Sequence, residues 1–331
     1  PRRGDRAGQT MTAVPVSPAA RAAAASRRGT PRTARVRDAR ERLIRGALAG
    51  CALLSVVTTF AIVGILAAET IRFLGMPEVS LADFLTGTTW SPLLGAQKQF
   101  GIWPLVCGTL LVTAIAAAFA LPVGLVTAIY LSEYAPPRVR TAVKPALEVL
   151  AGIPTVVYGY FALAVITPFL HDHVSERFGT FNALGAGLAV GIMILPIVAS
   201  LSEDALRAVP RSLRDAAYAM GGTRFDVSVK VVVPAALSGI MASWLLAITR
   251  AIGETMIVAL AAGGNPALTL DPSAEVQTMT AYMVQIFLGD APATGVEYRS
   301  SYAVAAVLFV ITLGLTVTGN LILRRFREEY D

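Results

Sequence analysis

Residues 183–201, ALGAGLAVGIMILPIVASL, form a run of nineteen positions without a charged side chain. A helix that crosses the hydrocarbon core of a bilayer needs about 20 mainly apolar residues. Five other predominantly apolar stretches of spanning length occur in the chain, at residues 46–68, 102–131, 146–170, 235–262 and 302–323. The sequence therefore predicts an all-α integral membrane protein with six transmembrane helices.

The composition excludes most soluble classes of protein. Hydrophobic residues make up 55% of the chain and charged residues 15%, with a mean hydropathy of +0.62, whereas a soluble domain carries about 25% charged residues. The chain has no Gly-x-x-x-x-Gly-Lys-Ser/Thr phosphate loop. No catalytic residue set stands out, and His171 and His173 lack the further ligands that a metal site needs. We therefore expect no enzyme activity, no metal and no cofactor in this chain.

Residues 1–45 differ from the remainder of the chain. They contain twelve arginines, no lysine and few large apolar residues. Because such a segment cannot bury a core, we expect it to be disordered. Residues 46–325 then form the transmembrane domain and residues 326–331 a short tail. For the arginine-rich region, contact with anionic membrane lipid is expected rather than binding of nucleic acid.

The basic residues also predict the orientation of the chain. With six spans, both termini lie on the same side of the membrane. Without the twelve N-terminal arginines, that side carries eleven Lys and Arg residues in its loops and tail, against four on the opposite side. Loops rich in Lys and Arg stay in the cytoplasm. Both termini are therefore predicted to be cytoplasmic.

A short amphipathic segment precedes the fifth predicted span. Pro210 suits the start of a helix and Gly221 its C-terminal cap, which predicts a surface helix over residues 211–221. Two interpretations remain open. The helix is either a connector that lies on the membrane, or a docking element whose small Ala216 and Ala217 allow close approach while Arg214 and Asp215 make directional polar contacts.

Residues 215–234 carry a pattern that favours the second interpretation. Asp-Ala-Ala is followed after three residues by Gly221, and after nine more by Val-x-Val-Pro. This pattern resembles the loop known as EAA in permeases of bacterial ATP-binding-cassette (ABC) importers, with Asp215 in place of the usual Glu. The resemblance implies a MetI-like, type I importer permease architecture. It also implies that Arg214, Asp215, Ala216, Ala217 and Gly221 belong to a coupling helix, which docks on a separate ATPase subunit.

Four further segments are similar to the phosphate-specific members of these permeases, namely residues 101–110, 130–136, 151–159 and 250–256. Residues 84–92 and 278–282 are more similar to the PstC-type subunit than to its PstA-type partner. The resemblance implies a multi-pass subunit of the bacterial inner membrane that encloses a path for inorganic phosphate together with a PstA-type permease. It further implies an ATPase dimer, which binds the ATP, and an extracytoplasmic phosphate-binding protein. The alternatives are another oxyanion, an organic solute, or a stand-alone secondary transporter.

Arg250 and Glu254 are charged residues within the fifth predicted span. Burying each of them at membrane depth costs at least about 2.5 kcal/mol. Because they are four residues apart, a continuous helix would bring them onto one face. They are either a structural ion pair or part of the substrate pathway. In the pathway, Arg250 attracts the passing anion, and Glu254 holds Arg250 in place and prevents tight binding that would trap the anion. Glu133, at the end of the second span, is expected to contact a neighbouring helix or the ATPase subunit.

Overall fold

The computed structural model describes residues 31–92, 98–289, 292 and 295–325. It divides into two units, residues 1–64 and residues 65–331. The first unit contains most of helix α2, Pro31–Leu74. The helix includes residues 31–45 of the region that the sequence predicts to be disordered, and residues 1–30 lie outside the described part. Ala and Arg favour helix, and Glu41 and Arg45 form an ion pair at 3.2 Å one turn apart.

Within the described residues, four helices are long and apolar enough to cross a membrane, and two bent helix pairs bring the number to six if each pair is one span. The four are α2, α4 with its π-helical extension, α8 and α15. The bent pairs are α5 with α6–α7, and α10–α11 with α12, which turn by 90° and 69°. The described elements from α4 onward, in chain order, are α4 (Trp103–Ile129), η1 (Tyr130–Tyr134), α5 (Pro137–Ala151), α6 (Thr155–Phe161), η2 (Ala162–Ile166), α7 (Thr167–His173), α8 (Ala183–Ala208), α9 (Arg211–Ala219), α10 (Arg224–Val227), η3 (Ser228–Val232), α11 (Val233–Ala235), α12 (Leu237–Ile252), α13 (Met256–Ala261), α14 (Met279–Leu288) and α15 (Val296–Arg325).

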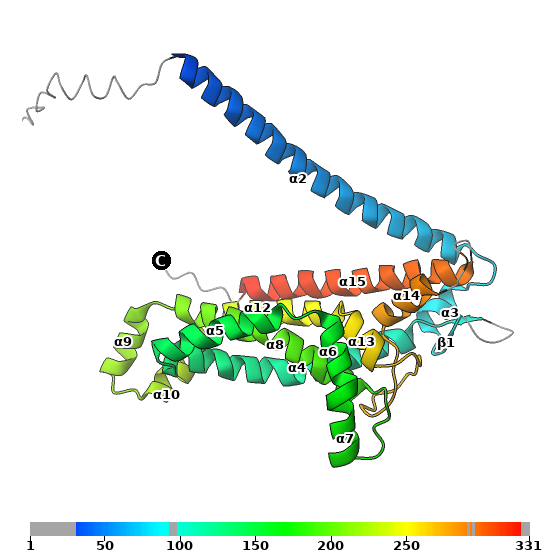
Figure 1. Ribbon diagram of the computed structural model, residues 1–331. Coiled ribbons are helices and arrows are strands. Elements are labelled where there is room, and N and C mark those ends of the chain that lie inside the picture. Colours follow the sequence, from blue (N-terminus) through cyan, green and yellow to red (C-terminus); the bar gives the residue numbers. More distant parts are fainter. Residues whose placement is uncertain (1–30, 93–97, 290–291, 293–294, 326–331) are drawn as a thin grey trace, which may run out of the picture. The chain divides into compact units, whose positions relative to one another are not determined.

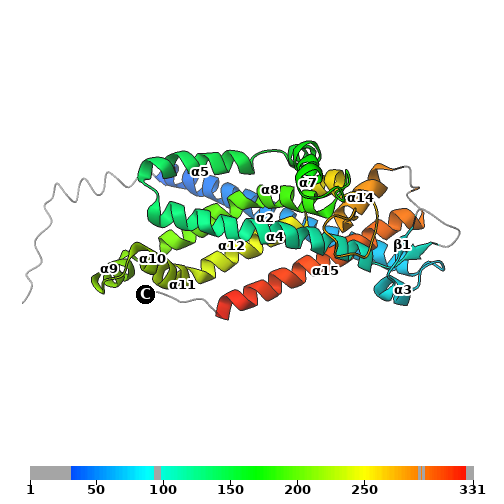
Figure 2. The same cartoon turned by 90° about the horizontal axis from the view of Figure 1, so that it is seen from below.

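Helices α4, α8 and α12 form the centre of the second unit and lie side by side in both views (Figures 1 and 2). Small side chains line the contact between α4 and α8, where Ala116, Ala120, Ala186 and Ala189 are fully buried. Small residues let membrane helices approach closely. The hydroxyls of Ser202 and Ser243 join α8 to α12 at 2.8 Å. Small side chains therefore let α4 and α8 pack closely, and a hydroxyl pair connects α8 to α12.

The end of this unit opposite α9 has its own apolar cluster, with α3 (Leu81–Thr86) and a two-stranded antiparallel hairpin, β1 (Trp90–Ser91) and β2 (Gln99–Phe100). Trp90 packs edge-on against Phe100 and Tyr282, with ring centroids 5.9 and 5.0 Å apart. Tyr282 also shares a hydrogen bond with Ser300. The cluster joins α14 and α15 to the segment before α4.

The third predicted span, residues 146–170, is not one helix. It crosses the break at residues 152–154, where α5 ends and α6 begins at 90° to it. Proline cannot donate the next helical hydrogen bond, and the break at Pro154 leaves a carbonyl of α5 without its helical partner. The hydroxyl of Tyr158 donates to the carbonyl of Leu150 at 2.7 Å. The amide of Ile153 also reaches this carbonyl, at 3.3 Å. A side chain from beyond the break therefore adds to the hydrogen bonding of the backbone before it, as membrane depth favours.

Candidate functional site

The fifth predicted span, residues 235–262, is also interrupted. Helix α12 ends at Ile252, and α13 starts only at Met256. Arg250 lies in the last turn of α12, whereas Glu254 lies in the non-helical connection. The expectation that these two side chains share one helical face is therefore wrong. The helix breaks between the two residues, and the carboxylate of Glu254 accepts hydrogen bonds from the first backbone amides of α13.

Glu254 is buried, with 8% of its surface exposed, and acts as a cap for α13. Its Oε1 accepts hydrogen bonds from the backbone N–H groups of Met256, at 3.1 Å, and Ile257, at 3.3 Å. These amides have no partner within the helix, so the carboxylate meets a need that the break creates. The backbone carbonyl of Glu254 accepts a further bond from the hydroxyl of Thr280, at 2.7 Å. The carboxylate therefore has a structural task that does not involve Arg250.

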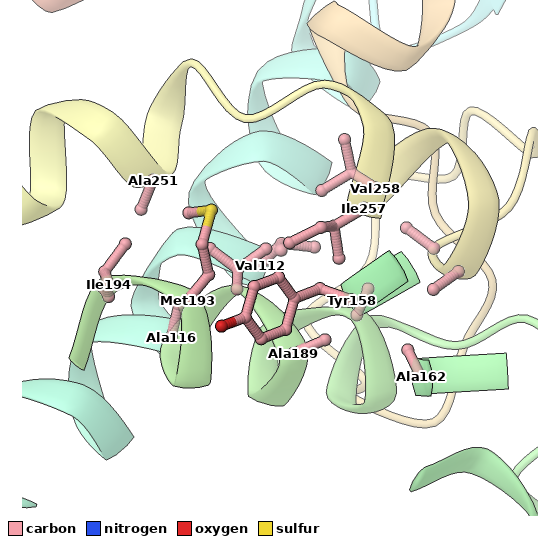
Figure 3. Close-up of a cluster of buried hydrophobic side chains, with 14 of the residues drawn as sticks. Val112, Ala116, Tyr158, Ala162, Ala189, Met193, Ile194, Ala251, Ile257 and Val258 are labelled. Carbon is pink, nitrogen blue, oxygen red and sulfur yellow. The ribbon is translucent and has the colours of Figure 1, made fainter. Parts of the chain in front are cut away.

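Arg250 has no carboxylate within ion-pair distance among the described residues, and it is exposed on the surface of this chain. Its side chain makes one weak polar contact to a described residue, from Nη2 to the Sδ of Met193 on α8, at 4.0 Å. Figure 3 shows Met193 between α8 and Ala251 of α12, in the central apolar cluster that also contains Tyr158. A guanidinium next to an apolar cluster, with its charge unpaired, is available to an anion from outside the chain.

Three of the sequence segments that carry the family resemblance, residues 101–110, 151–159 and 278–282, contact this break or the residues next to it. Gly159 of residues 151–159 packs against α13, where an added Cβ would lie 3.3 Å from the Cα of Ile257. Thr280 of residues 278–282 binds Glu254. Thr109 of residues 101–110 accepts a bond from the backbone N–H of Met279 at 3.0 Å. Segments separated by up to 170 residues in sequence thus build one region. The sequence alone did not predict the roles of Gly159, Thr109 and Thr280.

Helix α9 confirms the predicted surface helix, and its cap has a defined geometry. Gly221 has φ +85°, a conformation that a side chain disfavours. The amide of Gly222 donates to the carbonyl of Ala217, and that of Gly221 to the carbonyl of Tyr218. This pair of bonds is the Schellman motif, which ends a helix sharply and satisfies its last carbonyls. Gly221 therefore fixes the point at which α9 stops.

The two faces of α9 differ in their surroundings. Asp215 and Ala216 are exposed, whereas Leu213 and Ala217 pack against the apolar cluster beneath the helix. Tyr218, Met220 and nearby Phe225 are also exposed, Met220 at 89%. The outward face of α9 therefore combines a small side chain, that of Ala216, with exposed apolar ones. A surface of this kind suits a groove in another protein.

Arg214 does not point outward, contrary to the expectation that it makes polar contacts with a docking partner. Its guanidinium bonds both carboxylate oxygens of Glu133, at 3.1 and 3.4 Å, and the carbonyls of Leu206 and Val209, at 2.8 and 2.6 Å. Four contacts engage the guanidinium because the chain turns back on itself between α8 and α9. Arg214 thus anchors α9 to η1 and α8, and the expected contact of Glu133 with a neighbouring helix is confirmed.

A buried carboxylate next to this anchor was missed by the sequence analysis. Glu203 of α8 is 1% exposed. Three cations surround it: Arg140 at 2.8 Å, Lys144 at 3.0 Å and Arg207 at 3.6 Å. Lys144 also binds Asp204 at 2.8 Å. The only sequence signal was the four-residue spacing of Glu203 and Arg207, which lay beyond the predicted end of the fourth span.

The remaining polar residues suggest no metal centre. In the described part of the chain, no three His, Cys, Asp or Glu side chains gather as ligands would. The ring nitrogens of His171 and His173 lie 3.1 and 3.2 Å from backbone carbonyls.

In the segment before α14, hydrogen bonds from the amide and hydroxyl of Ser273 lower the pKa of Asp271 below its usual value.

Residues 120–327 match the family described as binding-protein-dependent transport system inner membrane component. The chain belongs to this family. The probable ABC transporter permease protein YqgH of Bacillus subtilis is 34% identical over 263 residues, which cover 79% of this chain and 84% of YqgH. The phosphate transport system permease protein PstC of Xylella fastidiosa is 32% identical over 299 residues, covering 84% of this chain and 90% of the relative.

Solved structures show the same fold. A chain of a bacterial alginate ABC transporter has a TM-score of 0.62 at 15% identity and covers 86% of this chain, with 95% of its own length matched. A chain of the MetNI methionine ABC transporter has a TM-score of 0.53 at 20% identity, covering 69% and 98%. The predicted all-α permease architecture is therefore confirmed. Together with the apolar helices, family membership makes this inner membrane component a multi-pass membrane protein and a transport subunit.

Proposed function

We propose that this chain is the permease subunit of an ATP-driven importer and that it forms, with a second permease, the transmembrane path for inorganic phosphate. One observation favours an anion as the transported substrate. Arg250 lies at a break in the fifth span with no carboxylate partner among the described residues. The relatives named as phosphate permeases, such as that of Mesorhizobium japonicum at 34% identity, support phosphate as the anion.

The guanidinium suits this role because its planar fork donates paired hydrogen bonds to phosphate oxygens. Its exposure on this chain is consistent with a path that is closed by a second permease of the PstA type. Glu254 keeps its carboxylate on the amides of α13, so it leaves the charge of Arg250 free. An anion would then be attracted without the tight binding that a closed cage of cations would produce.

The proposal requires that energy enter the permease through α9. The exposed Asp215 and Ala216 form the face expected to dock on an ATPase subunit, and Arg214 connects the helix to η1 and α8. A displacement of α9 by the ATPase subunit would therefore be transmitted to the ends of two spans, at η1 and at α8. In this proposal ATP binds the ATPase dimer, an extracytoplasmic binding protein delivers phosphate, and the α9 end with both termini faces the cytoplasm.

Transport assays in vesicles test this function directly. The chain, co-expressed with its permease and ATPase partners, is reconstituted in liposomes with ATP inside and the phosphate-loaded binding protein outside. We expect uptake of phosphate that needs ATP and exceeds sulfate uptake at least tenfold. Equal transport of sulfate would favour the broader oxyanion alternative. Uptake by this chain alone would instead show a secondary transporter.

A bulky residue on the outward face of α9 should disrupt the docking. Replacing Ala216 with Trp fills the space that close approach requires, while the exposed side chain leaves the fold of the chain unchanged. We expect at least a tenfold loss of ATPase subunit co-purified with the permease, measured by quantitative immunoblot. Ala142→Trp, at an exposed alanine of α5, is the matched control and should retain the subunit. Full retention by Ala216→Trp would contradict the docking assignment.

A further inference from the structure

A cavity of about 720 Å³ lies at the α9 end of the bundle, and nothing in the proposed transport path uses it. Residues of η1, α5, α8 and α9 line it. Five of the lining side chains are cations and two are carboxylates. The cations are Arg140, Lys144, Arg207, Arg211 and Arg214. Basic pockets between membrane helices are a recognised feature of proteins that hold anionic head groups.

The charges around the cavity are unequally compensated. Glu133 neutralises Arg214 at 3.1 Å. Buried Glu203 contacts Arg140 at 2.8 Å and Lys144 at 3.0 Å, and Lys144 also binds Asp204 at 2.8 Å, whereas Arg207 is 3.6 Å from Glu203. Glu148 is the second carboxylate in the cavity wall.

Arg211, at the first position of α9, has no hydrogen bond or ion pair to any described residue. Arg207 and Arg211 are both exposed, so their guanidinium groups can turn toward a ligand at little cost. The cavity therefore offers two weakly engaged guanidinium groups beside a layer of charges, Arg140, Lys144 and Arg214, that are paired with carboxylates.

This cavity is distinct from the Arg250 region. Met193, the neighbour of Arg250, and Arg207, in the wall of the cavity, are both on α8. Fourteen residues separate them, which is about 21 Å at a rise of about 1.5 Å per residue. An anion in the cavity would thus lie beyond the span interior, next to the helix that receives the ATPase.

We propose that the cavity binds a phosphate group, carried either by an anionic phospholipid or by free inorganic phosphate. Guanidinium groups pair with phosphoryl oxygens through two parallel hydrogen bonds. Leu131, Pro137 and Pro145 add an apolar portion to the wall, which gives a lipid glycerol region a surface to contact. A ligand held by Arg211 would also restrain α9, so occupancy would stiffen the coupling helix against the bundle.

Binding measurements distinguish the two sources of the phosphate group. The full chain, with any subunits that co-purify, is placed in phosphatidylcholine nanodiscs. In one arm, equilibrium dialysis measures binding of radiolabelled inorganic phosphate. In the other, native mass spectrometry of the detergent-solubilised protein measures retained phosphatidylglycerol. The test variant is Arg207→Gln combined with Arg211→Gln, which leaves Glu203 paired with Arg140 and Lys144.

We expect at least a tenfold loss of affinity in one arm, and the arm affected identifies the source. Phosphate held at Arg250 is common to both proteins and does not alter the comparison. Arg138→Gln, at an exposed arginine of α5 outside the cavity wall, should bind within twofold of the unmodified chain. If the double variant has a lowered thermal midpoint, Arg211→Gln alone takes its place, because Arg211 makes no pair that folding needs. Unchanged binding in both arms would overturn the proposal.

Discussion

Replacing Arg250 with Ala is expected to reduce ATP-dependent phosphate uptake to background, a loss of at least a hundredfold. The guanidinium is the charged group at the break that no described carboxylate neutralises, so its removal takes away the attraction for an anion inside the membrane. Assembly should survive, since the side chain makes only one weak contact, with Met193. Initial rates of radiolabelled phosphate uptake into proteoliposomes, normalised to the co-purified ATPase subunit, measure the effect.

Two control variants test whether uptake depends on where the positive charge lies and on the planar shape of the guanidinium. Arg224→Ala removes an exposed arginine on α10 and should retain normal uptake. Arg250→Lys keeps the charge but loses the planar fork, so we expect intermediate uptake, below the wild-type rate and above that of Arg250→Ala. Normal uptake by Arg250→Ala would show that the phosphate path does not pass this residue.

Replacing both Arg140 and Lys144 with Met is expected to destabilise the chain by about 3–5 kcal/mol. The double change leaves the 1% exposed carboxylate of Glu203 with Arg207 alone, at 3.6 Å. An unpaired buried charge is costly because it has lost its hydration without gaining a partner. Thermal unfolding of the detergent-solubilised protein, followed by size-exclusion chromatography after heating, should show the midpoint lowered by about 10 °C.

A third substitution tests whether the buried charge is the cause. Adding Glu203→Gln to the double variant removes that charge and should recover at least half of the lost thermal midpoint. Asp204→Ala is the matched single control, because the neighbouring carboxylate is 56% exposed and exposed ion pairs contribute about 0–1 kcal/mol. Failure of Glu203→Gln to restore stability would mean that packing at α5, and not the charge, holds this end of the bundle together.

Hydropathy predicted the number of spans but not where they break. It could not distinguish Pro122 and Pro196, which α4 and α8 contain without interruption, from Pro154, where the chain turns by 90°. The difference depends on tertiary partners. Tyr158 supplies the hydroxyl that satisfies Leu150, and a turn in the membrane is possible only where such a partner exists. A partner of this kind has no periodic signature in the sequence.

The candidate site was predicted in part. The helix predicted over residues 211–221 and its glycine cap follow from local signals, and the structure has a helix over Arg211–Ala219 that ends at Gly221. The expected alignment of Arg250 with Glu254 failed because it assumed an unbroken helix. The inward direction of Arg214 depends on the return of the chain after α8, which residue spacing within α9 does not encode. Glu203 was missed because its partners Arg140 and Lys144 lie about 60 residues away.

The contact at Gly159 has a mechanical consequence. A methyl group added to α6 at this glycine would lie 2.8 Å from Cδ1 of Leu260 and 3.3 Å from the Cα of Ile257 in α13, so a neighbour would have to shift. Each of these short helices follows a break, so each is attached to its longer neighbour only through a connection of three residues, 152–154 or 253–255. Close contact leaves no room for one to slide past the other. Because the two helices are in close contact at this glycine, we expect a tilt of one of them to displace the other.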